Sequence, residues 1–228
     1  MNKFKRIVIG LTVVTSLISS GCQNKLSKEM SVWNYYTEGE KAILLASYDM
    51  ALSYYEDALE SVLKAPDPLH PDITAGMIYF NMGYCYDQMG NSEEALTSYL
   101  QAYADESSKS LACSALGSLY FQLEKYELSK DYFEEAIVLD AKAYEAYVNL
   151  SALYSLEKDR KMALSLLSQA IEINNQKPDA YLNRAYLFAC LGDETLMKKD
   201  IETLKAMKFS SIDVYIKIFN DTLKEVQR

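Results

Sequence analysis

The chain has 228 residues, half of them hydrophobic, and its 23 Lys and Arg against 32 Asp and Glu give a net charge of −9. An acidic surface repels the phosphates of nucleic acids and anionic lipid heads. The composition therefore argues against a nucleic-acid-binding protein.

The N-terminus is typical of a secretory signal peptide over residues 1–21. Lys3, Lys5 and Arg6 form a positively charged start, an apolar to neutral stretch follows, and small residues precede Cys22. This stretch, residues 7–18, is too short to span a bilayer comfortably. The small residues before Cys22 resemble a bacterial lipobox, in which the cysteine is lipidated, with palmitate among the usual acyl groups, and becomes the new N-terminus.

The lipobox resemblance implies a lipid-anchored protein outside the cytoplasm, on the cell membrane or the outer membrane. Gln23 stands where many lipoproteins kept at the inner membrane have Asp, which favours the outer membrane. Simple secretion is the alternative, because Ser19 replaces the usual Leu. Residues 22–31 are interpreted as the lipidated cysteine and a short polar tether. Residues 1–21 hold three basic and no acidic residues, so their removal leaves a net charge of −12.

The rest of the chain repeats itself at a fixed interval. Four related dipeptides each lie 34 residues after the last: Met82-Gly83, Leu116-Gly117, Leu150-Ser151 and Arg184-Ala185. The same interval relates the fourth place of each unit, which holds Tyr79, Cys113, Tyr147 and Tyr181. Small residues recur at the eighth, twentieth and twenty-seventh places. Helices whose axes are about 8–10 Å apart need small side chains where they come closest. The pattern thus predicts pairs of packed helices.

This pattern resembles the tetratricopeptide repeat family, in which each unit is a pair of antiparallel helices. The resemblance implies an all-α fold: a right-handed superhelical solenoid of about five helical hairpins plus a C-terminal capping helix. We expect the solenoid over residues 32–209, with units near 32–65, 76–109, 110–143, 144–177 and 178–209.

Three irregular segments stand out. The first unit is divergent, and an insertion at 66–75 with three prolines separates it from the second, with Asp72 expected to cap the next helix. The fifth unit has Met197 and Leu204 where small residues are expected. Residues 210–228 are predicted to form the capping helix, beginning with a capping box of Ser210 and Asp213.

The sequence offers little for catalysis. The one histidine, His70, lies in the proline-rich insertion, and no glycine-rich phosphate loop is present. Cys85, Cys113 and Cys190 lack the close spacing of metal sites, and the first two are expected to be small buried hydrophobes. We therefore expect no catalytic residues, no metal and no cofactor, and a protein that is not an enzyme.

The family resemblance implies that the first helix of each unit lines a concave groove. Its second, fifth, sixth, ninth, twelfth and thirteenth places point inward, and we call these places the inner face. In the four regular units they hold no Lys or Arg, so the cations of the carboxylate-clamp branch are missing. Asparagine occupies the sixth place three times, and an amide can pair with the backbone of an extended peptide. Aromatic residues beside it could anchor a ligand. The predicted peptide-binding residues are Asn81, Asn149, Asn183, Phe80, Tyr84, Phe121 and Tyr186.

Two functions follow as hypotheses. The first is an envelope scaffold that holds a protein or peptide of unknown identity in its groove. The alternative is an envelope binding protein for a small apolar or glycan ligand that uses the aromatic inner face. For each asparagine and aromatic residue, ordinary packing within the repeats is the competing explanation.

Overall fold

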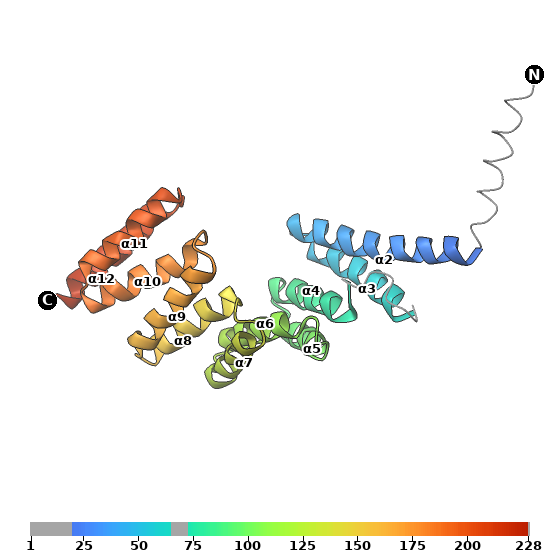
Figure 1. Ribbon diagram of the computed structural model, residues 1–228, viewed down its shortest axis with the longest axis horizontal. Helices are drawn as coiled ribbons and strands as arrows, with labels where there is room; N and C mark the ends of the chain where they lie inside the picture. The colour runs from blue at the N-terminus through green and yellow to red at the C-terminus, as the bar shows by residue number, and fades with distance from the viewer. Residues whose placement is uncertain (1–19, 65–72, 228) are drawn as a thin grey trace, which may run out of the picture. The chain divides into compact units, whose positions relative to one another are not determined.

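The computed structural model describes the backbone of residues 20–64 and 73–227, with side chains from residue 32 onward. Over these residues it contains helices and no strand (Figure 1). In chain order the helices are α2 (Ser20–Leu44), α3 (Tyr48–Lys64), α4 (Ala75–Gln88), α5 (Ser92–Tyr103), α6 (Lys109–Gln122), α7 (Tyr126–Leu139), α8 (Tyr144–Leu156), α9 (Arg160–Ile173), α10 (Pro178–Leu191), α11 (Glu194–Ala206) and α12 (Ile212–Val226).

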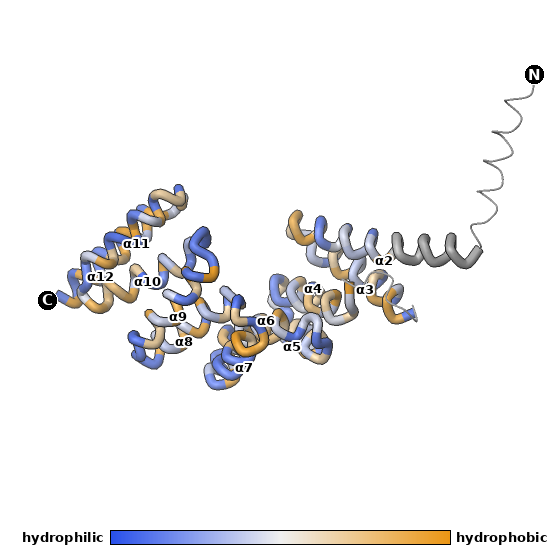
Figure 2. The backbone as a smooth tube through the Cα atoms, in the orientation of Figure 1, coloured by the Kyte–Doolittle hydropathy of each residue, from blue (hydrophilic) through white to orange (hydrophobic). Residues whose placement is uncertain are grey.

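The helices pack as hairpins within two compact halves of the chain. The N-terminal half ends at Ser108 and holds the hairpins α2–α3 and α4–α5, with α3 packed on α4. The C-terminal half begins at Lys109 and holds the hairpins α6–α7, α8–α9 and α10–α11, followed by α12. The predicted all-α fold of five hairpins and one last helix is confirmed. Figure 2 shows hydrophobic and hydrophilic residues on the same helices, as expected for helices that bury one face.

The small residue at the eighth place marks the closest approach within a hairpin. A Cβ atom added to Gly83 would lie 2.6 Å from the ring of Tyr99, and one added to Gly117 would lie 2.7 Å from the ring of Phe133. Both rings come from the twenty-fourth place of the same unit and are buried. The prediction that small residues lie where the paired helices meet is confirmed at these positions.

The turn inside each hairpin also follows the 34-residue interval. Gly90 and Gly192 have positive φ angles of 79° and 77°, a left-handed conformation that glycine adopts without strain at the end of a helix. The equivalent turns of the other three units contain no glycine, yet they adopt the same backbone conformation, at Ala46, Glu124 and Lys158. The repeat therefore fixes the turn geometry even where the residue type does not favour it.

The last hairpin is closed by α12. Met197 and Leu204 are completely buried in a cluster that includes Phe219 and Leu223 of α12. Large residues fit at these two places because a single terminal helix, and not another hairpin, covers them. In the same hairpin Arg184 of α10 donates two hydrogen bonds to the buried carboxylate of Asp200 on α11, at 2.8 and 2.7 Å.

Two predicted helix starts are wrong. The N-cap of α4 is Thr74, whose hydroxyl accepts from the backbone N–H of Met77, so Asp72 does not cap this helix. The N-cap of α12 is Ser211, which makes no side-chain capping hydrogen bond, so the expected capping box at Ser210 does not form.

Other expectations fall partly or wholly outside the described residues. The signal peptide, residues 1–21, lies almost entirely outside them, and so does the proline-rich part of the 66–75 insertion with His70. The segment 22–31, interpreted as a tether, has a helical backbone because it belongs to α2. The domain boundaries remain a prediction.

Candidate functional site

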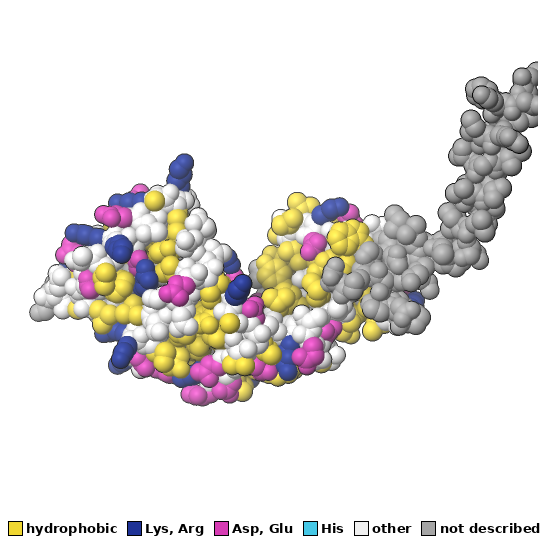
Figure 3. All heavy atoms as spheres, viewed as in Figure 1, with side chains coloured by type: hydrophobic (Ala, Val, Ile, Leu, Met, Phe, Trp, Pro, Cys, Tyr) yellow, Lys and Arg dark blue, Asp and Glu magenta, His cyan; other side chains and the backbone are white. Residues whose placement is uncertain are grey.

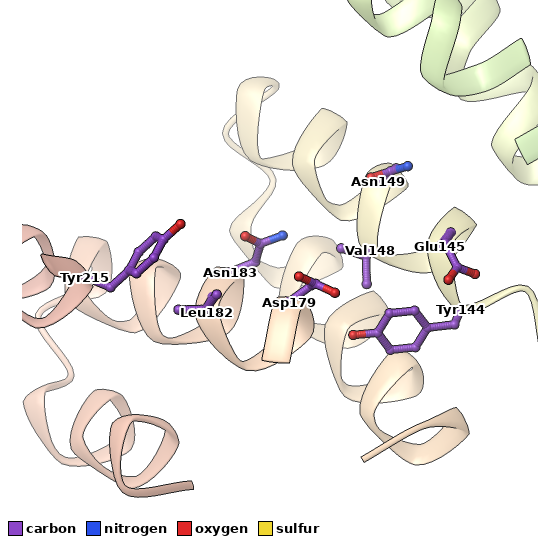
Figure 4. A pocket seen from close by; sticks show the side chains of 8 residues that line it. All are labelled: Tyr144, Glu145, Val148, Asn149, Asp179, Leu182, Asn183 and Tyr215. Carbon is purple, nitrogen blue, oxygen red and sulfur yellow. The ribbon is translucent and has the colours of Figure 1, made fainter. Parts of the chain in front are cut away.

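The first helices of the fourth and fifth hairpins line a pocket of about 360 Å³ in the C-terminal half. Its walls come from α8, α10 and α12, and Figure 4 shows Asp179 and Asn183 on α10 between Tyr144 and Tyr215. Six of its residues occupy the second, fifth and sixth places of their units, which the sequence assigned to the inner face. The lining is Tyr144, Glu145, Val148, Asn149, Asp179, Leu182, Asn183 and Tyr215.

A second pocket, of about 240 Å³, lies between α6, α7 and α8. It is lined by Ser118, Phe121, Gln122, Phe133, Asn149 and Ala152, and all of these except Phe133 are inner-face residues. Asn149 lines both pockets. The inner face of the C-terminal half therefore has a pocket on each side of the Asn149 amide.

The three predicted asparagines differ in what their amides already bind. Asn149 donates from Nδ2 to the hydroxyl of Ser118 at 3.1 Å, and that hydroxyl donates in turn to the carbonyl of Ser114 at 3.0 Å. Asn81 donates to the hydroxyl of Tyr36 at 3.0 Å. Both amides thus link their helix to the first helix of the preceding hairpin. These two hydrogen bonds are consistent with packing within the repeats, which is the competing explanation for these asparagines.

Asn183 lacks that link. The residue equivalent to Ser118 in the preceding hairpin is Ala152, whose methyl group accepts no hydrogen bond. Asn183 is exposed, and among the described residues its amide has no hydrogen-bond partner. It is therefore the asparagine whose donor and acceptor are both free to contact a ligand.

Tyr144 fixes one end of the larger pocket. Its hydroxyl accepts from the backbone N–H of Ala180 at 3.2 Å, which ties the start of α8 to the start of α10. Burial raises the pKa of Tyr144. Lys177 lies over the ring, with Nζ 4.6 Å from its centroid, and also forms an ion pair with Glu145. This wall of the pocket is held in place by contacts across two hairpins.

The four predicted aromatic anchors are all in contact with other rings. In the N-terminal half, Phe80 lies against Tyr99 and Tyr84 against Tyr48, with ring centroids 5.9 and 6.4 Å apart. In the C-terminal half, Phe121 contacts Tyr126, and Tyr186, which is 45% exposed, contacts Phe219 of α12. Only Phe121 lines one of the two pockets.

The structure thus brings Asn149 together with Asn183 in one pocket and with Phe121 in the other. Sequence reasoning missed two residues of the larger pocket, Tyr144 and Tyr215. Tyr144 precedes the inner-face places by one position, and Tyr215 belongs to the predicted capping helix. The position of Tyr215 on the pocket depends on how α12 packs, for which the repeat pattern carries no signal.

The described residues offer little for metal or thiol chemistry. Cys85 and Cys113 are completely buried, as expected, and burial raises the pKa of Cys85 to about 11 and of Cys113 to about 12. No cluster within residues 32–64 and 73–227 has the side chains to hold a metal ion. No helix in the described part of the chain is both long and apolar enough to cross a membrane.

Acidic side chains are abundant away from the pockets. In Figure 3 they gather along the lower edge, where α7 lies, and Glu127, Asp131 and Glu134 of that helix are exposed. Because α7 is the second helix of its hairpin, these carboxylates do not belong to the inner face.

Comparison with known proteins agrees with the repeat pattern. A tetratricopeptide repeat model matches residues 78–104, 111–142 and 144–177. Regulatory protein RapG of Bacillus subtilis (strain 168) is 21% identical over 174 residues, which cover 72% of this chain and 48% of RapG. The chain therefore spans about half the length of this curated relative.

Solved structures show the same fold at low sequence identity. PilF of Pseudomonas aeruginosa is 15% identical with a TM-score of 0.67, and the match covers 88% of this chain and 90% of that one. YrrB, described as a tetratricopeptide repeat protein with an unusual peptide-binding site, is 19% identical with a TM-score of 0.53, and the match covers 80% of this chain and 90% of that one. With the 34-residue interval, the hairpins and the family match in agreement, residues 78–104, 111–142 and 144–177 match tetratricopeptide repeats, and the chain has the fold of tetratricopeptide repeat proteins.

Proposed function

We propose that the protein is a lipid-anchored interaction scaffold of the bacterial cell envelope that binds an extended segment of a partner protein along its inner face. The observation that carries this proposal is the pair of pockets that share Asn149, lined mainly by inner-face residues. Repeated amides and shallow pockets along a row of parallel helices suit a ligand that is itself extended and repetitive, such as a polypeptide backbone.

The amides provide the chemistry for such a ligand. Asn183 offers a donor and an acceptor, and Asn149 keeps its Oδ1 acceptor after its bond to Ser118. A peptide backbone presents both an N–H and a C=O in every residue other than proline, so side-chain amides can bind it regardless of its sequence. The peptide-binding site described for YrrB supports the same type of ligand for this fold.

The proposed anchor is Cys22, lipidated after removal of residues 1–21, which would hold the repeats at a membrane surface outside the cytoplasm. Support comes from the basic residues Lys3, Lys5 and Arg6, the apolar stretch after them and the small residues before the cysteine. Gln23 favours the outer membrane where a cell has two.

The binding proposal is tested by capture of partners from a detergent-solubilised envelope with three forms of the tagged protein. Wild type should retain a protein in stoichiometric amount. Asn183→Ala should reduce the affinity for it by about tenfold, because one or two hydrogen bonds are lost. The control is Asn34→Ala, which removes an exposed amide of α2 that lies outside both pockets.

Asn183 is a cleaner probe than Asn149, because truncation of Asn149 also breaks its bond to Ser118 and should lower stability by about 1 kcal/mol. A partner that binds the Asn183→Ala protein as tightly as wild type would overturn the inner-face mode. Absence of any retained protein, together with stable binding of a small apolar molecule or glycan, would instead favour the alternative function.

A further inference from the structure

The larger pocket carries one negative charge that the protein itself does not balance. Glu145 is neutralised by its ion pair with Lys177. Asp179 is exposed, and among the described residues it makes neither an ion pair nor a hydrogen bond. No Lys or Arg lines the pocket. The uncompensated charge of this wall therefore belongs to Asp179.

Asp179 does not cap its helix as two other aspartates of this chain cap theirs. Asp159 and Asp193 are N-caps, and each accepts a backbone N–H at 3.0 Å, from Met162 and Leu196. The N-cap of α10 is Lys177, and Asp179 lies in its first turn without such a bond. The helix dipole stabilises a carboxylate at this place by only about 0.3–1 kcal/mol. The interaction with the helix dipole leaves the carboxylate oxygens of Asp179 able to accept hydrogen bonds.

The surroundings of Asp179 are suited to a cation on an aliphatic stem. Val148 and Leu182, which are 8% and 9% exposed, give the pocket an apolar floor. Asn183 lies one helical turn after Asp179, and its amide is free (Figure 4). Tyr215 adds an aromatic wall from α12. An Arg or Lys side chain has this combination of an apolar stem and a charged, hydrogen-bonding end.

We propose that this pocket takes an Arg or Lys side chain of the bound segment, with Asp179 as its counter-ion. The proposal rests on the proposed function, since it names the side chain that an extended ligand places between α8, α10 and α12. The stem lies on Val148 and Leu182, and the amide oxygen of Asn183 accepts from the cationic group or from the adjacent backbone. The partner is thus a segment with a basic residue.

The test uses the purified full-length chain and a bead-displayed library of random octapeptides. If the inference holds, the retained peptides should be enriched in Arg or Lys at one position. A tight-binding peptide from this set, and its version with that residue replaced by Gln, are then compared by fluorescence anisotropy. The Gln version should bind wild type about three- to tenfold more weakly, and higher salt should reduce the difference.

Three variants locate the effect. Asp179→Asn should lose the preference for the basic residue and bind both peptides alike, whereas Asp179→Glu should retain a preference. Asp131→Asn removes an exposed carboxylate from α7, outside the pocket, and should behave as wild type. Thermal unfolding monitored by circular dichroism shows whether each variant is folded.

The outcomes separate this inference from the proposed function. Retained peptides without a basic preference, or a preference unchanged in Asp179→Asn, would overturn the cationic pocket and leave the peptide-binding scaffold standing. Retention of no octapeptide at all would overturn both the extended-peptide mode and the cationic pocket.

Discussion

At the scale of single residues, the eighth and twenty-fourth places of each unit form matched pairs. Glycine faces an aromatic ring, whereas serine or alanine stands where the partner is aliphatic. The pairs in chain order are Gly39 with Tyr55, Gly83 with Tyr99, Gly117 with Phe133, Ser151 with Leu167 and Ala185 with Ile201. In the three glycine pairs an added Cβ would lie 2.6–2.7 Å from the ring. The size of one member therefore limits the size of the other.

This relation predicts the sign of one substitution. Gly83→Ala in an open helix would gain about 1 kcal/mol, but here the methyl group meets Tyr99, and we expect a loss of about 1–3 kcal/mol. Tyr99→Leu makes room for that methyl group. The double variant should therefore lose less stability than the sum of the two single variants, as measured by urea unfolding. Strictly additive losses would contradict the pairing.

The turn residues give a second test at this scale. Lys158 is exposed and has a φ angle of 64°, a conformation that glycine adopts without strain. Lys158→Gly should therefore stabilise the fold by about 1 kcal/mol and raise the midpoint of thermal unfolding. Ser165→Gly, in the interior of α9, is the matched control and should lower it. A lower midpoint for both variants would show that the turn carries no such strain.

At the scale of elements, the repeat interval predicted each hairpin because every regular unit carries its own packing signals. Those signals do not extend to the end of the array. Met197 and Leu204 departed from the pattern, and only the structure shows that α12 buries them. The hydrogen-bonded pair of Arg184 and Asp200 was also not predicted, because a charged residue at a repeat position carries no mark of its partner on the next helix.

The role of α12 is tested by two neighbouring side chains. Phe219 is 2% exposed and packs in the terminal cluster, whereas Ile218 is 45% exposed on the same helix. Phe219→Ala should cost about 3–5 kcal/mol because it leaves a cavity, and Ile218→Ala should cost less than about 0.5 kcal/mol. Thermal unfolding followed by circular dichroism measures both. Equal, small effects would mean that α12 does not close the core.

At the scale of the whole molecule, the sequence predicted the helical face that carries the candidate site more completely than the site itself. The inner-face places follow from the family register, and Glu145, Val148 and Leu182, which line the larger pocket, occupy such places. The hydrogen bond of Asn149 to Ser118 depends on which residue the preceding hairpin presents. The position of Tyr215 on the pocket depends on how the terminal helix, α12, packs. Neither is encoded in a single repeat.

The proposed anchor would determine where the whole protein works, and it is inferred from the sequence of residues 1–23. Lipidation of Cys22 would add acyl chains that hold a protein at a membrane, with about 0.8 kcal/mol for each buried methylene group and two chains needed for stable attachment. Cys22→Ala should therefore block processing, so that the precursor accumulates, or release the protein from the membrane fraction. Globomycin should cause the wild-type precursor to accumulate in the same way.

Cys190→Ala is the matched control, because it removes a half-buried thiol of α10 far along the chain from the processing site and should leave fractionation unchanged. Mass spectrometry of the N-terminal peptide of the membrane-bound protein should find Cys22 acylated. A mature wild-type protein that is soluble in the periplasm or culture fluid would favour simple secretion. The inner face would then be free to meet its partner away from any membrane, and the envelope capture would have to be repeated on secreted proteins.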